Sequence, residues 1–221
     1  MRQIIGGVFV SLDGVLQAPG GPDDDKTGGF ALGGWLPQFF DPVLGERVDK
    51  LFTPPFDLLL GRRTYEIFAA HWPYVTGEAK SLGERFDSAA KYVVTGGKQR
   101  LDWQNSHRLE SLDAIAELKR GEGPPLVIQG SGTLYPQLLR AGLLDRLILM
   151  SFPVILGSGK RLFADGTPPG AMRMVGHQVT PSGNIIATYQ PHGAIEIGSF
   201  QQPEPSAAEL ERRQRVKQGT W

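Results

Sequence analysis

The chain of 221 residues contains no cysteine, so neither a disulfide framework nor a thiolate nucleophile is available to it. No stretch approaches the roughly 20 consecutive apolar residues of a membrane-spanning helix. The four histidines show no pair at helical ligand spacing, which predicts that no metal is bound. Lysine plus arginine equal aspartate plus glutamate, at 23 each, and the lack of a basic excess argues against nucleic acid as a partner. The N-terminus lacks the apolar core of a signal peptide, so we expect a cytoplasmic location and no membrane partner.

Glycine and proline are abundant, at 29 and 17 residues, and they are spread along the chain as turn punctuation. The length and the apolar share of 40% are sufficient for one domain, which we place at residues 1–198. Residues 199–221 are predicted to be a linker and a polar C-terminal helix or tail, because Ser206–Glu209 has a capping-box pattern.

Hydrophobic periodicity and turn signals predict an alternation of short strands and helices. We expect strands at 3–10, 56–60, 91–95, 125–129 and 144–151, helices at 42–52, 62–70, 111–120 and 133–141, and a hairpin at 171–190. The predicted fold class is α/β: a mixed, mainly parallel sheet with helices on both faces and a C-terminal antiparallel hairpin. Residues 17–34 are predicted to be a long surface loop that contributes nothing to the core.

Two stretches far apart in the chain have the same design. The apolar run Phe56–Leu60 leads into Gly61–Glu66, and Leu126–Gln129 leads into Gly130–Tyr135. A glycine allows close approach of the backbone to a ligand, and the free N–H groups of a following helix favour an anion. Two such turns in one domain indicate a ligand with several phosphates, most simply a dinucleotide.

The second turn lacks the third glycine of an ordinary NAD-binding Rossmann fingerprint and the acidic residue that holds a ribose hydroxyl. Basic residues stand near the expected ribose instead: Arg62, Arg63, Lys98 and Arg100. Since arginine makes bidentate contacts to phosphate, the sequence favours NADP(H) over NAD(H).

Four motifs, in the same order, resemble the dihydrofolate reductase-like superfamily. Gly61–Glu66 and Ile128–Tyr135 resemble the two cofactor turns of dihydrofolate reductase, and Val8–Val15 fits the first strand and turn of the same group. Phe152–Gly159, followed by Leu162 and Phe163, resembles the reductase domain of the bacterial riboflavin deaminase-reductase. The resemblance spans residues 1 to about 190, and it implies a reductase with a dihydrofolate reductase-like fold.

The resemblance implies NADPH as cofactor. Arg62, Arg63 and Thr64 would contact the adenosine side and the phosphates of the cofactor. Thr95 would lie near the 2′-phosphate, and the second glycine turn would bind the pyrophosphate. The cofactor-binding residues implied are Gly61, Arg62, Arg63, Thr64, Thr95, Gly130, Ser131, Gly132, Thr133, Leu134 and Tyr135. Residues 10–15 would lie beside the nicotinamide, and the loop after them would act as a lid.

Dihydrofolate reductase carries a carboxylate on the helix before the first cofactor turn, and Glu46 and Asp49 bracket that position here as candidate proton donors. The expected reaction is NADPH-dependent hydride transfer to a small-molecule substrate, resembling reduction of 5-amino-6-(5-phosphoribosylamino)uracil. Reduction of a pterin and a non-catalytic nucleotide-binding module are the alternatives. The resemblance also implies a homodimer.

Overall fold

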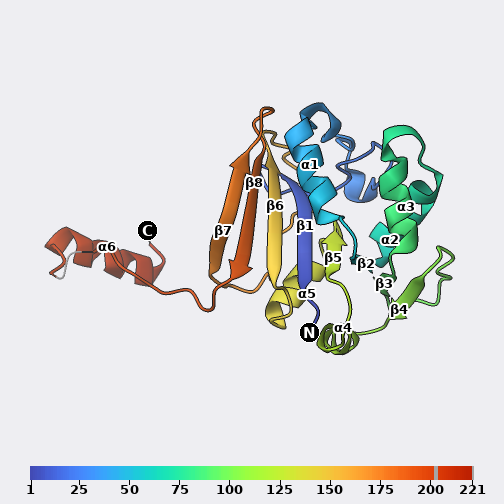
Figure 1. The fold of residues 1–221 in the computed structure, drawn as a ribbon. Helices are drawn as coiled ribbons and strands as arrows, with labels where there is room; N and C mark the ends of the chain where they lie inside the picture. Colours follow the sequence, from blue (N-terminus) through green and yellow to red (C-terminus); the bar gives the residue numbers. More distant parts are fainter. Residues whose placement is uncertain (202–203, 221) are drawn as a thin grey trace.

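The computed structural model describes residues 1–201 and 204–220, which form an α/β body and a C-terminal extension (Figure 1). Within these residues one sheet has the spatial order β4-β3-β2-β5-β1-β6-β8-β7. The strands are β1 (Ile4–Ser11), β2 (Asp57–Gly61), β3 (Lys91–Val94), β4 (Ser106–Leu109), β5 (Leu126–Gln129), β6 (Arg146–Phe152), β7 (Met172–Val179) and β8 (Ile185–Pro191). β1 to β6 pair in parallel, whereas β8 is antiparallel to both β6 and β7. The predicted fold class is therefore confirmed.

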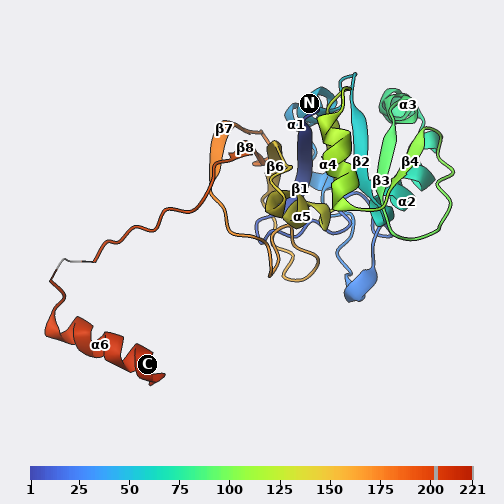
Figure 2. The ribbon, with the colours of Figure 1, turned by 90° about the horizontal axis from the view of Figure 1, so that it is seen from below.

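Helices cover both faces of the sheet (Figure 2). The helices of the body are α1 (Pro42–Leu51), α2 (Arg62–His71), α3 (Lys80–Ser88), α4 (Leu112–Arg120) and α5 (Leu134–Arg140). Short 3-10 turns lie at Thr27–Gly29, Pro37–Phe39, Trp72–Tyr74 and Gly77–Ala79, and α6 (Ala207–Gln218) stands apart from the body. No helix in the described part of the chain is long and apolar enough to cross a membrane.

Alternation along the strands assigns the two layers of the core. Leu126 and Ile128 of β5 pack in the cluster that contains α4 and α5. Val127, between them, packs on the other face in the cluster that contains α2 and α3. The central parallel strands are thus buried on both faces, which explains why they are rich in apolar residues.

The carboxyl edge of the sheet is stepped. The last residues of β2 and β3, Gly61 and Val94, are paired with each other, and β5 ends at Gln129, opposite Gly7 in the middle of β1. β1 continues beside β6 as far as Ser11. The side of β1 that faces β5 therefore has no neighbouring strand beyond Gly7, and the turns after β2 and β5 lie at this step.

The sequence did not predict α3 or β4. α3 contains Gly83 in its interior, where a Cβ atom would lie 2.7 Å from the carbonyl oxygen of Trp72, so tertiary packing selects this glycine against helix propensity. β4 is a short polar edge strand without an apolar alternation. The expectation that residues 17–34 add nothing to the core is wrong: Ala18 and Phe30 are each 5% exposed and belong to the core cluster that also contains Leu44 of α1.

Candidate functional site

The two glycine turns meet and are joined by hydrogen bonds. The backbone N–H of Gly61 donates to Oγ of Ser131 at 2.9 Å, and the backbone N–H of Ser131 donates to Oγ1 of Thr64 at 3.1 Å. They meet because β2 and β5 are parallel neighbours, so their carboxyl ends open at the same place. The structure thus brings together the two motifs that share the same pattern in the sequence, an apolar strand followed by a glycine turn and a helix.

The backbone conformation and the close packing of the second turn require glycine at two of its positions. Gly130 has φ +71° and Ser131 has φ +54°, both in the left-handed region. A Cβ atom at Gly132 would lie 2.8 Å from Cδ2 of Leu16, so the segment after β1 passes directly over the turn. This contact places Leu16, the residue after the Val10–Val15 stretch, beside the second glycine turn.

The amide groups of the turns divide into two sets. The N–H groups of Gly61 and Ser131 already donate hydrogen bonds to side-chain hydroxyls of the other turn. The N–H groups of Gly132 and Thr133 have no hydrogen-bond acceptor among the described residues. The first-turn amides of α2 also lack intrahelical partners, as at any helix start. These remaining donors are the ones that can bind an anion.

The basic side chains predicted beside the turns lie at the surface. Arg62 forms an ion pair with Glu66 at 2.8 Å, one helical turn further along α2. Arg63 and Lys98 are exposed and form no ion pair within the described residues. The hydroxyl of Thr95, at the end of β3, accepts hydrogen bonds at 3.1 and 2.9 Å within its own turn.

Two of the predicted cofactor residues have side chains that face the core. Leu134 and Tyr135 open α5 and are buried, and the Tyr135 hydroxyl donates to the carbonyl of Gly7 at 3.3 Å. Burial raises the pKa of Tyr135, so the hydroxyl stays protonated. Its ring lies where a Cβ atom of Gly6 would otherwise stand. These side chains hold α5 on the sheet, and contact with a ligand is left to the backbone of the turn.

The two candidate proton donors lie on the outer side of α1. The Glu46 side chain is 64% exposed and forms an ion pair with Lys50, and the Asp49 side chain is 60% exposed and pairs with Arg85 of α3. Neither carboxylate contacts the glycine turns. Their catalytic role stays a prediction that this placement does not support.

Sequence reasoning missed Gln129, the last residue of β5. It is 9% exposed, and its Oε1 atom is buried with no hydrogen-bond partner among the described residues. The side chain lies on the α1 face, since a Cβ atom at Gly7 would be 3.3 Å from Gln129 Oε1 and 2.4 Å from Leu51 Cδ2. Leaving a buried amide oxygen unpaired is unfavourable, so the atom is a candidate acceptor for a ligand. The available signal was a polar residue closing an apolar strand directly before a glycine turn.

Asp13 fastens the segment after β1 to the segment after β6. Its carboxylate accepts hydrogen bonds from the Ser11 hydroxyl at 2.7 Å and from the backbone N–H groups of Leu156 at 3.0 Å and Gly157 at 2.9 Å. These donors, the Ser11 hydroxyl foremost, lower the pKa of Asp13 to about 2. The carboxylate is therefore ionised at neutral pH and keeps both segments in place.

The loop expected to act as a lid is held against the same segment. Gln17 is buried, donates to the carbonyls of Asp25 and Thr27 at 2.9 Å each, and accepts from the backbone N–H of Lys160 at 3.0 Å. The Lys160 ammonium group contacts the carboxylate of Asp25 and the hydroxyl of Thr27 at 2.5 and 2.6 Å. The first half of the loop is therefore bonded in place beside the step at the end of β1.

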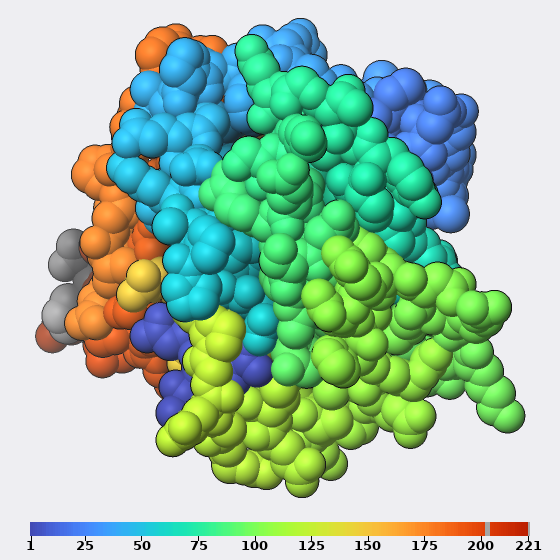
Figure 3. Space-filling view, turned by 45° about the vertical axis from the view of Figure 1, so that its right-hand side comes forward, coloured from blue at the N-terminus to red at the C-terminus, as the bar shows by residue number. Residues whose placement is uncertain are grey.

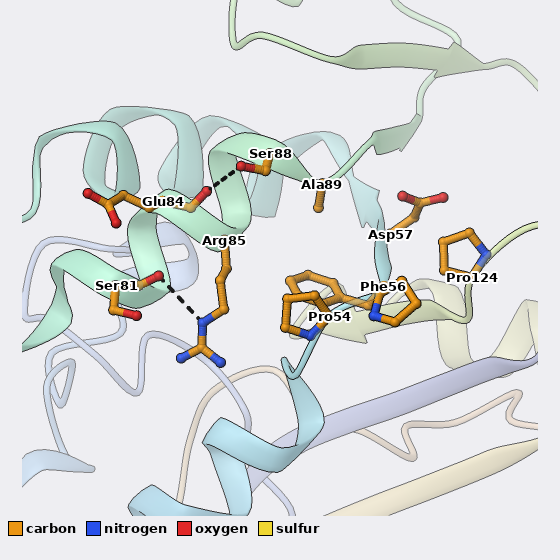
Figure 4. A pocket seen from close by; sticks show the side chains of 10 residues that line it. Pro54, Phe56, Asp57, Ser81, Glu84, Arg85, Ser88, Ala89 and Pro124 are labelled. Carbon is orange, nitrogen blue, oxygen red and sulfur yellow. Dashed lines mark hydrogen bonds between the residues drawn. The ribbon is translucent and has the colours of Figure 1, made fainter.

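Two surface pockets lie away from the turns. One, of about 430 Å³, opens between α3 and the segments before β2 and β5, where Pro54, Arg85 and Pro124 line it (Figures 3 and 4). Asp57 lines it too and is the first residue of β2, whereas Gly61 is the last, so this pocket is at the opposite end of the strand from the turns. The second, of about 280 Å³, lies between α1 and the β7–β8 pair, with Glu46 on its wall.

The parallel sheet, the stepped carboxyl edge and the two joined glycine turns define a dihydrofolate reductase-like fold. Consistent with this class, dihydrofolate reductase from Enterococcus faecalis complexed with NADP(H) and RAB-propyl superposes with a TM-score of 0.54 at 17% identity, covering 86% of this chain and 96% of that one. A protein of Shewanella sp. PV-4 assigned to riboflavin biosynthesis has a TM-score of 0.63 at 20% identity, covering 86% and 99%.

The chain belongs to the RibD C-terminal domain family, whose model matches residues 2–186. The protein YyaP of Bacillus subtilis (strain 168) is 26% identical over 197 residues, covering 87% of this chain and 96% of YyaP. Membership of this family, together with the dihydrofolate reductase-like fold, supports the conclusion that the protein is a reductase of the RibD C-terminal domain family.

Proposed function

We propose that the protein is an NADPH-dependent reductase that transfers a hydride to a small-molecule substrate held between α1 and the carboxyl edge of the sheet. The observation that carries the proposal is the junction of the two glycine turns beside a buried, unpartnered amide oxygen. When bound, NADPH supplies the hydride from its nicotinamide ring.

The residues at the step fit a dinucleotide. The amides of Gly132 and Thr133 and the first turn of α2 offer donors on two sides of one junction, which suits a pyrophosphate. Side chains at Gly130 or Gly132 would disturb this turn, because of the positive φ of the first and the Leu16 contact of the second. The same residues would hold the cofactor along the ends of β2 and β5.

A preference for NADPH over NADH rests on the exposed cations beside the first turn. Arg63 follows Gly61 by two residues, and Lys98 lies in the turn after β3, the strand next to β2. Both are exposed and lack an ion pair among the described residues, so they are available to a 2′-phosphate at no cost in broken bonds. Arg62 would first have to leave Glu66.

The substrate would lie on the α1 face of the step, where Gln129 can accept a hydrogen bond from an N–H or O–H group. An aminopyrimidine carries such donors, in keeping with the substrate 5-amino-6-(5-phosphoribosylamino)uracil that the family resemblance suggests. Since Glu46 and Asp49 are exposed and paired elsewhere, we assign the proton to water. The chain's own residues then orient the substrate and exclude bulk solvent.

The test is an assay of NADPH oxidation, followed at the nicotinamide absorbance, with 5-amino-6-(5-phosphoribosylamino)uracil as substrate. Turnover that requires this compound, with the ribityl product identified by mass spectrometry, is the expected result. NADPH binding without turnover of this compound would rule out this substrate.

A nucleotide-binding module without catalysis is the second candidate, and the outward placement of both helix carboxylates favours it. The two candidates separate on one measurement. NADPH is labelled with deuterium at C4 of its nicotinamide, and substrates of the riboflavin and pterin classes are added in turn. A reductase transfers the deuterium to a product. With a binding module, the labelled cofactor stays unchanged for every substrate tested.

A further inference from the structure

The groove of about 280 Å³ between α1 and the β7–β8 pair is built for a small ligand. Its volume is near the lower end of small-molecule sites, which measure roughly 300–1,000 Å³. The groove is open because Gly176 of β7, which pairs with Thr188 of β8, has no side chain: a Cβ atom there would meet nothing within 4 Å. Its walls include one face of α1, formed by Val43, Glu46, Arg47 and Lys50.

Two arginines at this groove lack a counter-ion among the described residues. Arg47 is half-buried, and its Nη2 atom donates to Oγ1 of Thr188 at 3.1 Å, but no carboxylate pairs with it. Arg146, the first residue of β6, is half-buried too, and its guanidinium forms neither a hydrogen bond nor an ion pair within the same residues. Both arginines lie on the same face of the sheet, since Ile148, two residues after Arg146, pairs with Thr188.

The charges of these two arginines are uncompensated. Burial and the neighbouring charge of Arg146 lower the pKa of Arg47, although a guanidinium stays protonated at neutral pH. The other two charged side chains of the groove, Lys50 and Glu46, form an ion pair with each other at 2.7 Å and add no net charge. Two like charges held together and partly withdrawn from water are unfavourable, and a bound anion would relieve this cost.

We propose that the groove binds a small phosphate monoester. Such an ester carries close to two negative charges at neutral pH, which matches the two arginines, whereas a monocarboxylate would neutralise only one of them. Guanidinium N–H groups also fit phosphate oxygens in pairs. The Thr188 hydroxyl accepts from Arg47 and donates to no other described residue, so its proton is available to a further phosphate oxygen.

This site is separate from the glycine turns and from the proposed substrate position. In the sheet β8 is four strands away from β2, which ends at Gly61, and four inter-strand spacings amount to roughly 19 Å. Leu51 of α1 faces Gly7 beside Gln129, whereas Arg47 faces Thr188. The phosphate would therefore contact α1 on the side away from Gln129, and its binding requires neither NADPH nor turnover.

The first test titrates the full-length protein with inorganic phosphate and with glycerol 3-phosphate at constant ionic strength, followed by calorimetry. We expect saturable binding of both at millimolar concentrations or below, and at least about tenfold weaker binding in Arg47→Met and in Arg146→Met. Arg120→Met is the matched control, because it removes the same charge from a side chain that is 66% exposed on α4. No saturable binding by the wild type, equal loss in Arg120→Met, or tighter binding of acetate than of phosphate overturns the proposal.

The same titration in the presence of saturating NADPH separates this groove from the glycine turns. Phosphate affinity should stay within about threefold of its value without the nucleotide, because distant sites act independently. If NADPH abolishes phosphate binding, the anion occupies the turns and the proposal fails. If NADPH itself does not bind, the proposed function fails, while the dependence on Arg47 and Arg146 still decides the present question.

A second test fills the groove without changing its charge. Gly176→Leu places a side chain in the open space beside Thr188, and the φ angle of Gly176 lies outside the left-handed region, so the variant should fold. Phosphate binding should be lost, while the urea midpoint without phosphate stays that of the wild type. Gly198→Leu, at another glycine with open space around it, is the control and should bind phosphate normally. A folded Gly176→Leu variant that binds phosphate as tightly as wild type contradicts the proposal.

Stability in phosphate-free buffer distinguishes a ligand site from a structural role of the arginines. Since Arg146→Met removes a repulsive charge that has no partner among the described residues, its urea midpoint should equal or exceed that of the wild type. A lower midpoint together with unchanged phosphate affinity would mean that Arg146 only supports the fold.

Discussion

Thr64 and Ser131, 67 residues apart, are joined by a hydrogen bond of 3.1 Å from the backbone N–H of Ser131 to Oγ1 of Thr64. Together with the 2.9 Å bond from Gly61 to Ser131 Oγ, it fixes the distance between the two turns. A ligand that spans both turns therefore meets donors that are already in place, which lowers the entropic cost of binding.

Thr64→Val removes the acceptor of this bond while keeping the branched shape of the side chain. We expect a loss of about 0.5–1.5 kcal/mol in the free energy of unfolding and about tenfold weaker NADPH binding, equivalent to roughly 1.4 kcal/mol. Urea denaturation and nicotinamide fluorescence measure the two effects. Thr64→Ser is the matched control, because it restores the hydroxyl. Equal NADPH affinity in all three proteins would show that the junction has no part in binding.

Gln129→Leu removes the buried amide oxygen that lacks a partner. Since an unsatisfied polar atom is lost, stability should be unchanged or higher. With the substrate of the proposed reaction, KM should rise at least about tenfold, the cost of one hydrogen bond of about 1.4 kcal/mol. NADPH affinity should stay the same, because the side chain faces α1 and not the glycine turn. Wild-type KM together with lowered stability would mean that Gln129 is only structural.

Glu46→Gln and Asp49→Asn test the assignment of the proton to water. Both carboxylates are more than half exposed and paired with cations on the protein surface. Turnover should therefore change by less than about threefold, whereas loss of a general acid typically costs about 10²–10⁴-fold. A loss of that size in either variant, with unchanged NADPH affinity, identifies the altered carboxylate as the donor.

Asp13 gives a stability effect with a defined pH window. Its folded-state pKa is lowered to about 2, below the value of 3.8 for an unperturbed aspartate, so protons bind more tightly to the unfolded chain. The stabilisation is therefore complete above about pH 4 and is lost as the pH falls through about 2. Asp13→Asn should lower the urea midpoint at pH 7 and flatten its dependence on pH in this window.

The exposed Asp23→Asn variant is the control for Asp13→Asn, since the side chain of Asp23 is 82% exposed. It removes the same charge without touching the two segments. If both variants lower the midpoint equally at pH 7, net charge and not the Asp13 hydrogen bonds explains the effect.

The strands other than β4 and the two glycine turns were predictable because their signals are local: an apolar run, a glycine and a helix start. The same local reasoning included Tyr135 among the ligand contacts, although its ring fills the space above Gly6 in the core. Position in a motif does not tell which way a side chain points. That depends on the pairing of β1 with β5, which only the folded chain reveals.

Three features depended on long-range contacts and were missed for that reason. Gly83 makes α3 look like a loop until its contact with Trp72 is seen. Phe30 lies in a segment rich in glycine and proline, and its ring is packed against the distant Gly159, where a Cβ atom would be 3.0 Å from Phe30 Cε2. The absence of a partner for Gln129 Oε1 is a property of the packed core and not of any window of sequence.

The most direct test of the account is a parallel titration of the full-length protein with NADPH and NADH, followed by nicotinamide fluorescence. We expect NADPH to bind at least about tenfold more tightly than NADH, a gap of roughly 1.4 kcal/mol. Arg63→Ala should weaken NADPH binding and leave NADH binding unchanged. Failure of both nucleotides to bind would contradict the account, because the joined glycine turns would then be structural elements alone.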